Sequence, residues 1–277
     1  MQASLEHGAF RGQPIDVRTR RSLSLVDESS DAFLVDHFFH DGRFFAARIP
    51  RRGVVRIHGQ TLNFGGGRGW LGGLLNHAQA RFVLGAGYCV ELLAAVRADA
   101  PVVGRVADFC YSVEAVGPPG VAWSLRHAFG DLIAAHRFLS TSEVVFERVV
   151  RGGFVVRQSP PLRLTADQMQ RGLELLVRRS AAAGLRQRYY LLTARGSARN
   201  CTSSVFDALD RVRAEEYTPF QRLASRLLWR LPLHLRRYLD VRAAIDPAAT
   251  MPPLEDELAE LVASAAMQAR LPRPVAR

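Results

Sequence analysis

The segment from Pro160 to Arg213 constrains the fold most, because it predicts a helix, a short strand and a second helix in that order. Thr165, followed three residues later by Gln168, has the signature of a capping box at a helix start. Apolar residues then recur with helical spacing, and Gly184 suits the C-terminal end of this helix. The aromatic and aliphatic run that follows predicts a strand. We therefore expect a domain that contains both helices and strands.

The first part of the chain predicts strands. Aromatic and branched residues on both sides of an Asp41-Gly42 turn are typical of a β-hairpin. The stretch 71–115 mixes apolar and small residues without a period that separates helix from strand. Further along the chain we expect a third strand, a helix and another strand, at residues 54–57, 123–138 and 144–156.

Three regions are expected in the 277 residues. Residues 1–29 are polar and arginine-rich, which predicts a loosely ordered basic arm. Residues 30–245 are long enough for one large domain. Residues 246–277 predict one acidic helix, over Leu254–Ala266, and a frayed basic tail.

The chain is strongly basic, with a formal net charge of +11, and every one of its 37 lysine-plus-arginine residues is an arginine. An arginine surface attracts phosphate, carboxylate and anionic lipid groups. Nucleic-acid binding is not favoured, because the sequence has no zinc finger, no aromatic RNA-binding motif and no basic region leading into heptads. The first 23 residues lack the apolar core of a signal peptide, and no run reaches the roughly 18 apolar residues of a membrane span. The sequence alone therefore predicts a cytoplasmic protein.

The three cysteines differ in their surroundings. Their wide, unequal spacing predicts neither a disulfide framework nor a metal site, and no cofactor motif is present. Cys89 and Cys110 lie in apolar stretches typical of buried structural thiols. Cys201 ends a polar loop and precedes a predicted helix over 203–213. The free N–H groups of a helix start favour a thiolate, so Cys201 is the candidate nucleophile. An unreactive buried thiol at a helix start fits the same pattern.

A thiol nucleophile needs a base, usually histidine, and groups that orient the reacting atoms. Asn200 and Thr202 offer side chains for capping the helix and for orienting an oxyanion. Three of the eight histidines lie on the predicted hairpin and the next strand, and these are the candidate bases: His37, with His40 and His58 as alternates. The side chains that could orient the imidazole are Asp31, Asp36 and Asn63.

The Tyr-Tyr-Leu-Leu, Asn-Cys-Thr and Leu-Asp pattern over residues 189–210 resembles a bacterial family of unknown function. That family is typified by the N-terminal periplasmic domain of the lipoprotein N-acyltransferase Lnb. Three further segments, 38–48, 162–168 and 231–239, are similar to its other motifs. The resemblance covers about residues 30–245 and implies an α+β, circularly permuted NlpC/P60-like (papain-like) domain, with an antiparallel sheet and packed helices.

The same resemblance implies an activity. Cys201 matches the family's nucleophile, which implies a cysteine-dependent hydrolase or acyltransferase that forms a thioester with an ester or amide substrate, including a lipid-linked one. It also implies the cell envelope as the location. The family usually has a histidine at the head of the first strand, where this chain reads Ser30–Leu34 without one. Either His37, which shares strand parity with Asp31, supplies the base, or the domain is a catalytically inactive, arginine-rich binding domain.

A third hypothesis is a peripheral membrane protein. Arginines alternate with leucines over residues 222–237, a composition that suits an anionic lipid surface. A core-packed helix with outward arginines fits the same pattern.

Overall fold

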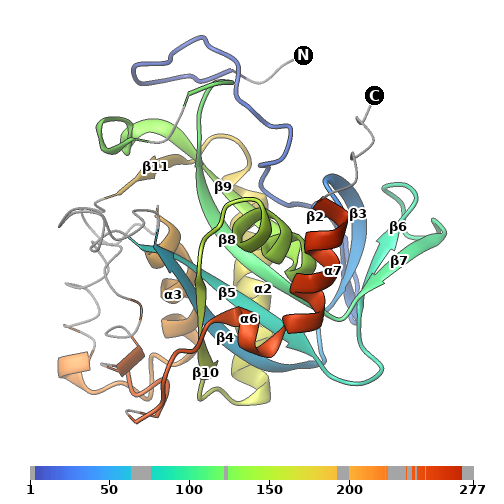
Figure 1. Cartoon of the computed structure of the whole chain (residues 1–277), viewed down its shortest axis with the longest axis vertical. Helices are drawn as coiled ribbons and strands as arrows, with labels where there is room; N and C mark the ends of the chain where they lie inside the picture. The colour runs from blue at the N-terminus through green and yellow to red at the C-terminus, as the bar shows by residue number, and fades with distance from the viewer. Residues whose placement is uncertain are drawn as a thin grey trace.

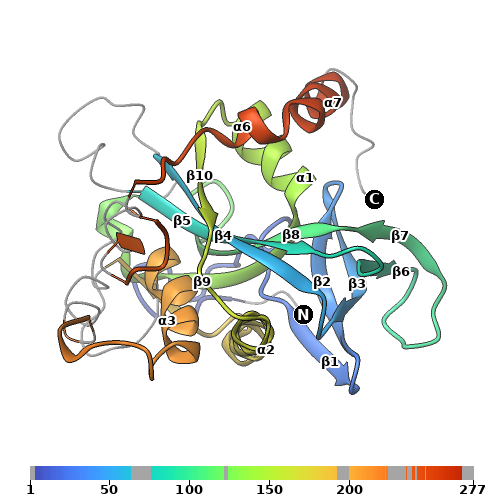
Figure 2. The same ribbon diagram turned by 90° about the horizontal axis from the view of Figure 1, so that it is seen from below.

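The computed structural model describes residues 4–63, 76–121, 124–191, 200–221, 223, 235, 239–240, 242–246 and 248–269. Within these ranges the chain forms an α+β fold, in which a large mixed sheet carries helices on both of its faces (Figures 1 and 2). The strands are β1 (Ser24–Glu28), β2 (Ala32–His40), β3 (Arg43–Pro50), β4 (Val54–Asn63), β5 (Asn76–Leu84), β6 (Val90–Leu93), β7 (Val102–Val106), β8 (Asp108–Val116), β9 (Phe129–Ser140), β10 (Val156–Pro161) and β11 (Arg188–Tyr190). The helices are η1 (Leu125–His127), α1 (Thr141–Val144), η2 (Val145–Val150), α2 (Ala166–Ala183), α3 (Cys201–Val212), α6 (Leu254–Glu257) and α7 (Ala259–Ala269).

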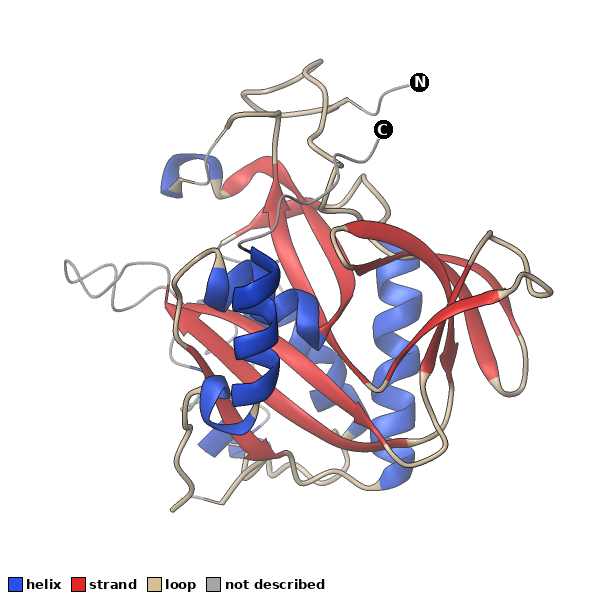
Figure 3. Cartoon of the chain, turned by 45° about the vertical axis from the view of Figure 1, so that its right-hand side comes forward, coloured by secondary structure: helices blue, strands red, loops and turns tan. Residues whose placement is uncertain are grey.

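The described strands form one 11-stranded sheet in the order β10, β4, β5, β8, β9, β2, β3, β6, β7, with β1 paired to β2 and β11 to β9. Its pairings are antiparallel except for a parallel contact between β2 and β9 at Phe39 and Leu139. The β6–β7 end of the sheet lies far from α3 (Figure 1). Figure 3 shows the helices packed against the strands. The expected α+β fold with packed helices is confirmed, but the sheet, which was expected to be antiparallel, is mixed because β2 pairs with β9 in parallel.

The two faces of the sheet differ in polarity. Helices α2 and α3 cover one face, and α1, η2, α6 and α7 lie on the other (Figure 2). On β5, Ala78, Ala80 and Phe82 belong to the main apolar core under α2 and α3. Successive strand residues point to opposite faces, so His77 and Arg81, with the residues of like parity, face the second set of helices. The β5 side chains on both faces of the sheet are buried because helices cover both faces.

An ion cluster around Glu114 joins four parts of the chain on the second face. The Glu114 carboxylate accepts hydrogen bonds from Arg137 Nη1 at 2.7 Å and from Arg148 Nη2, and it forms an ion pair with Arg20 Nε at 3.0 Å. Arg137, which is 1% exposed, also donates to Glu147 at 3.0 Å. Burial raises the pKa of Glu114, but the arginines outweigh burial and hold this pKa well below its usual value. The carboxylate is therefore ionised in the folded protein.

Two predictions for the middle of the chain are wrong. The helix expected over 123–138 is a short 3-10 turn followed by β9, which pairs with β8 over eight residue pairs from Phe109↔Ser140 to Val116↔Ile133. A strand buried on both faces is almost continuously apolar, so its period cannot be told from that of a buried helix. The strand expected over 144–156 begins only at Val156. Before it, α1 and η2 are helical despite their valines, because contacts with α7 override the local strand preference.

Several other predictions are confirmed. The hairpin around Asp41-Gly42 is β2–β3, and the third strand is β4. Helix α2 has the expected capping box between Thr165 and Gln168 and ends at Gly184. The single acidic helix expected over Leu254–Ala266 is instead two helices, α6 and α7, which meet at Leu258.

The N-terminal segment, which the sequence predicts as a loose basic arm, is packed in the part that the structure describes. Leu5, Ile15 and Leu23 are buried, and β1 pairs with β2. Most of the arginine- and leucine-rich segment 222–237 lies outside the described residues. Among the helices that the structure describes, none has both the length and the apolar character needed to cross a bilayer.

Replacement of Glu114 by glutamine should destabilise the fold by about 3 kcal/mol, because it leaves buried arginines without their ionised partner. Since the folded-state pKa of Glu114 lies below its ordinary value of 4.5, the ionised group stabilises the fold above that pH. This contribution is lost as the pH falls from 4.5 toward the folded-state pKa. Urea unfolding of Glu114→Gln between neutral and acidic pH should therefore show a smaller acid-induced loss than the unmodified chain. The control is Glu6→Gln, at an exposed glutamate; equal stability of the two variants would contradict the prediction.

Candidate functional site at Cys201

Helix α3 begins at Cys201, two residues earlier than the sequence predicts, and Asn200 is its N-cap. The Asn200 Oδ1 atom accepts a hydrogen bond from Ser203 N at 2.7 Å, and Ser203 Oγ accepts one from Asn200 N at 3.2 Å. Asn200 Nδ2 also donates to Leu191 O at 2.8 Å, which ties the helix start to the end of β11. Asn200 is fully buried, so its amide fixes where the helix begins. The capping role expected for Asn200 is confirmed.

The Cys201 sulfur lies against the beginning of β5, and the residue is 3% exposed. It is 3.9 Å from Asn76 O and 3.9 Å from Thr202 Oγ1. Hydrogen bonding from the backbone of Ala78 and Thr202 and from the side chains of Thr202 and Tyr189 lowers the pKa of this thiol. These β5 residues precede the stretch that pairs with β8, which begins at Gln79. The first turn of α3 therefore lies beside the part of β5 that does not pair with β8.

Burial decides the ionisation of this thiol. It raises the pKa of Cys201, and the hydrogen bonds from Ala78, Thr202 and Tyr189, which lower the pKa, do not compensate. A helix start contributes at most about 2 kcal/mol to an adjacent anion, whereas removing a charge from water costs several kcal/mol. The pKa of Tyr189 is raised as well, first by its burial and then by the neighbouring Cys201. At neutral pH the sulfur is therefore a thiol, and the thiolate expected from the sequence is not favoured.

The histidine chosen first from the sequence, His37, lies on β2 at a bulge and has a backbone φ of 69°. Its Nδ1 atom is 3.2 Å from Ser22 O, and its Nε2 atom is 3.4 Å from Asp36 Oδ2. Asp36, one of the three side chains predicted to orient the imidazole, therefore contacts the His37 ring. Burial lowers the pKa of His37, so the ring is neutral at neutral pH.

The two alternate histidines also have other partners. His40 Nδ1 is 2.8 Å from Ser140 Oγ, and His58 Nδ1 is 2.9 Å from Ser159 O. Among the contacts of the described residues, none joins the Cys201 sulfur to His37, His40 or His58. The structure brings Cys201, Asn200 and Thr202 together and leaves the three candidate bases elsewhere.

Two further residues, Asn63 and His77, are neighbours of Asn76, whose carbonyl contacts the sulfur. Asn63, named as an orienting group, ends β4 and pairs with Asn76, whose carbonyl contacts Cys201. His77 lies between the two β5 residues that contact the sulfur, but its ring points to the other face, with Nε2 2.8 Å from Ser112 Oγ. Burial, aided by Arg148, lowers the pKa of His77 to about 3. The polar and apolar alternation of residues 76–82 was the signal for a strand at this place.

Replacement of Asn200 by alanine should destabilise the protein by about 1 to 2 kcal/mol, because it removes a helix cap in a buried position. Asn200→Ser keeps an oxygen that can accept from Ser203 N and loses only the bond to Leu191 O. Urea unfolding should therefore rank the unmodified chain above Asn200→Ser, and Asn200→Ser above Asn200→Ala. An unchanged midpoint for the alanine variant would show that the cap contributes nothing.

Comparisons with known proteins add no relative. No family model matches this chain, and neither a curated protein nor a solved structure does. The resemblance to the family typified by the Lnb periplasmic domain therefore rests on the sequence motifs alone.

Proposed function

We propose that this chain is a binding domain with a permuted NlpC/P60-like arrangement, in which Cys201 is a structural thiol and arginines on the surface recognise an anionic partner. The burial of Cys201 carries this proposal, since the residue is 3% exposed. Nucleophilic catalysis needs an accessible thiolate with a base within hydrogen-bond reach. Burial keeps this sulfur protonated, and the three candidate histidines bond to other groups.

The arrangement of elements supports the fold part of the proposal. A helix that begins at Cys201 packs its first turn on an antiparallel sheet, after a helix and a short strand in the order α2, β11, α3. The α2–α3 face of the sheet holds the main apolar core.

A second candidate is the cysteine-dependent hydrolase or acyltransferase acting on an ester or amide. One feature favours it: hydrogen bonding from the backbone of Ala78 and Thr202, at the start of α3, lowers the pKa of the Cys201 thiol. Donors grouped in this way would stabilise an oxyanion if a substrate carbonyl reached them. This candidate requires that the site open to admit substrate.

Surface arginines support an anionic partner. Nine exposed arginines form no ion pair within the described part of the chain: Arg11, Arg43, Arg52, Arg56, Arg126, Arg151, Arg157, Arg171 and Arg186. Because they lie on many different elements, we expect attraction spread over the surface. An anionic membrane surface is the partner that this composition suits, since its charge is also spread out.

Thiol labelling separates the two candidates. Iodoacetamide at neutral pH should modify Cys201 slowly in the native protein and rapidly in denaturant, because the native thiol is buried and protonated. Peptide mass spectrometry follows each cysteine in the same sample. Cys89 is partly buried and Cys110 fully buried, so they are the internal references for fast and slow labelling. Native labelling of Cys201 faster than Cys89 would favour the enzyme.

Vesicle sedimentation tests the anionic partner. The chain should sediment with vesicles that contain anionic lipid at low salt and be released at about 1 M salt, where the screening length falls to about 3 Å. Vesicles of zwitterionic lipid are the control and should retain little protein at either salt concentration. Equal sedimentation with both kinds of vesicle, or no binding at low salt, would contradict a charge-driven partner.

A further inference from the structure

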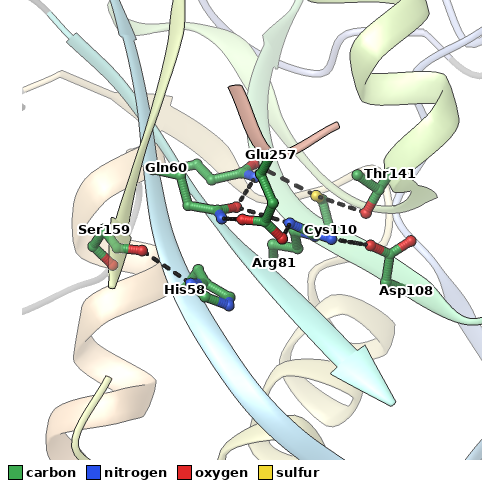
Figure 4. A network of polar contacts seen from close by, with 9 residues as sticks. His58, Gln60, Arg81, Asp108, Cys110, Thr141, Ser159 and Glu257 are labelled. Atoms are coloured by element: carbon green, nitrogen blue, oxygen red, sulfur yellow. Dashed lines mark hydrogen bonds and ion pairs between the residues drawn. The ribbon is translucent and has the colours of Figure 1, made fainter. Parts of the chain in front are cut away.

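The second face of the sheet carries a network of polar side chains, here called the polar layer (Figure 4). Strand pairing places its members side by side, with His58 opposite Arg81, and Gln60 opposite both Gln79 and Gln158. Buried amides link the strands, since Gln79 Nε2 donates to Gln60 Oε1 at 2.6 Å and Gln60 Nε2 donates to Gln158 Oε1 at 2.8 Å. The polar layer is thus preorganised by the sheet.

Arg81 is the cation of the polar layer and its side chain is 4% exposed. Its Nε and Nη2 atoms donate to Asp108 Oδ2 at 2.8 and 2.5 Å. Its Nη1 atom donates to Glu257 Oε1 at 2.9 Å, while Gln158 Nε2 donates to Glu257 Oε2 at 2.5 Å. The sheet therefore holds the Glu257 carboxylate with one donor for each oxygen.

Glu257 comes from a segment at the other end of the chain, residues 251–269, here called the C-terminal strap. The strap lies over the second face of the sheet (Figure 2) and is joined to β10 by a bond from Gln158 N to Pro252 O at 3.0 Å. Its apolar residues pack on η2 in a cluster separate from the main core, which includes Val145, Phe146, Val156, Leu254 and Ala265. A segment with its own small apolar cluster can open without unfolding the main core.

Two buried acceptors in the polar layer are unused. His58 is 4% exposed, and its Nδ1 donates to Ser159 O at 2.9 Å, which leaves Nε2 as an acceptor. Within the described residues neither His58 Nε2 nor Gln79 Oε1 has a hydrogen-bond partner. Buried polar atoms without partners are rare and call for an explanation. Both residues neighbour Arg81 in the sheet: His58 is directly across the strand pair, and Gln79 is two residues along β5.

We propose that the polar layer is a binding site for a carboxylate that also carries an N–H or O–H donor, and that Glu257 occupies the carboxylate position when the strap is closed. The ligand carboxylate would accept from Arg81 Nη1 and Gln158 Nε2, and its donor would bond to His58 Nε2 or Gln79 Oε1. An α-amino acid and the free C-terminal residue of a peptide both have these groups close together.

The charge balance favours a carboxylate over other anions. Arg81 already bonds to Asp108, so the cluster in the closed state has one cation and two carboxylates. The carboxylate of a ligand would replace that of Glu257 charge for charge beside the buried Arg81, whereas a phosphate would add negative charge beside Asp108. The exchange involves no covalent step.

The test uses the full chain with Glu257→Ala, which vacates the cradle, and Glu260→Ala as the matched control at an exposed glutamate of α7. Melting temperatures are compared in acetate, glycine and chloride at equal ionic strength. Glycine should raise the melting temperature of Glu257→Ala by roughly 2 to 5 °C at ten times its Kd, and acetate by less, because acetate lacks the second donor. Chloride should have no such effect, and Glu260→Ala should respond to none of the three.

Further arms identify the source of the carboxylate and guard against a folding defect. A tripeptide with a free C-terminus and its amidated form distinguish a peptide end from a free amino acid. Arg81→Gln in the Glu257→Ala background should abolish the response. If Glu257→Ala does not fold, amide hydrogen exchange of residues 254–269 in the unmodified chain replaces it, and glycine should accelerate that exchange as it displaces Glu257.

The proposal fails if glycine and acetate act no differently from chloride on Glu257→Ala, or, in the exchange experiment, if glycine leaves the strap unchanged. Glu257 would then be a permanent anchor of the C-terminal helices.

Discussion

The buried ion cluster around Glu114 is the interaction on which the second face of the sheet depends. It joins Arg20 of the N-terminal region, β8, β9 and η2 through one carboxylate. Charges of this kind are stable inside a protein only when all partners are in place. The sheet therefore has an apolar core under α2 and α3 and a charged interior under the other helices, and the elements that cover the second face are fixed by hydrogen bonds as much as by apolar contact.

The same physics, the cost of removing charge from water, governs Cys201 with the opposite result. Glu114 has three guanidinium groups and stays ionised, whereas the Cys201 sulfur has only backbone and hydroxyl donors and stays protonated. Position at a helix start is a weak influence when the group is buried without a cation. The anionic character of a buried site therefore depends on its charged partners more than on the element that carries it.

Strand β5 separates the two candidate sites. Asn76 and Ala78 give their backbone groups to the Cys201 sulfur, while Gln79 and Arg81 give their side chains to the polar layer. One strand serves both sites because its residues alternate between two covered faces. Helix α3 covers the Cys201 site, and the C-terminal strap covers the polar layer. A ligand in one site therefore does not require movement of the element that covers the other.

The sequence by itself determined the features that local chemistry specifies: the capping box of α2, the hairpin at Asp41-Gly42, and a helix that follows Asn200 within a few residues. Each of these depends on residues a few positions apart. Only the tertiary structure decided that residues 129–140 form a strand, that the Cys201 sulfur is buried away from the candidate histidines, and that Arg81 meets Glu257, 176 residues along the chain. Whether a residue is buried, and which distant residue it contacts, depend on the segments that pack over it. A local sequence pattern does not specify those segments.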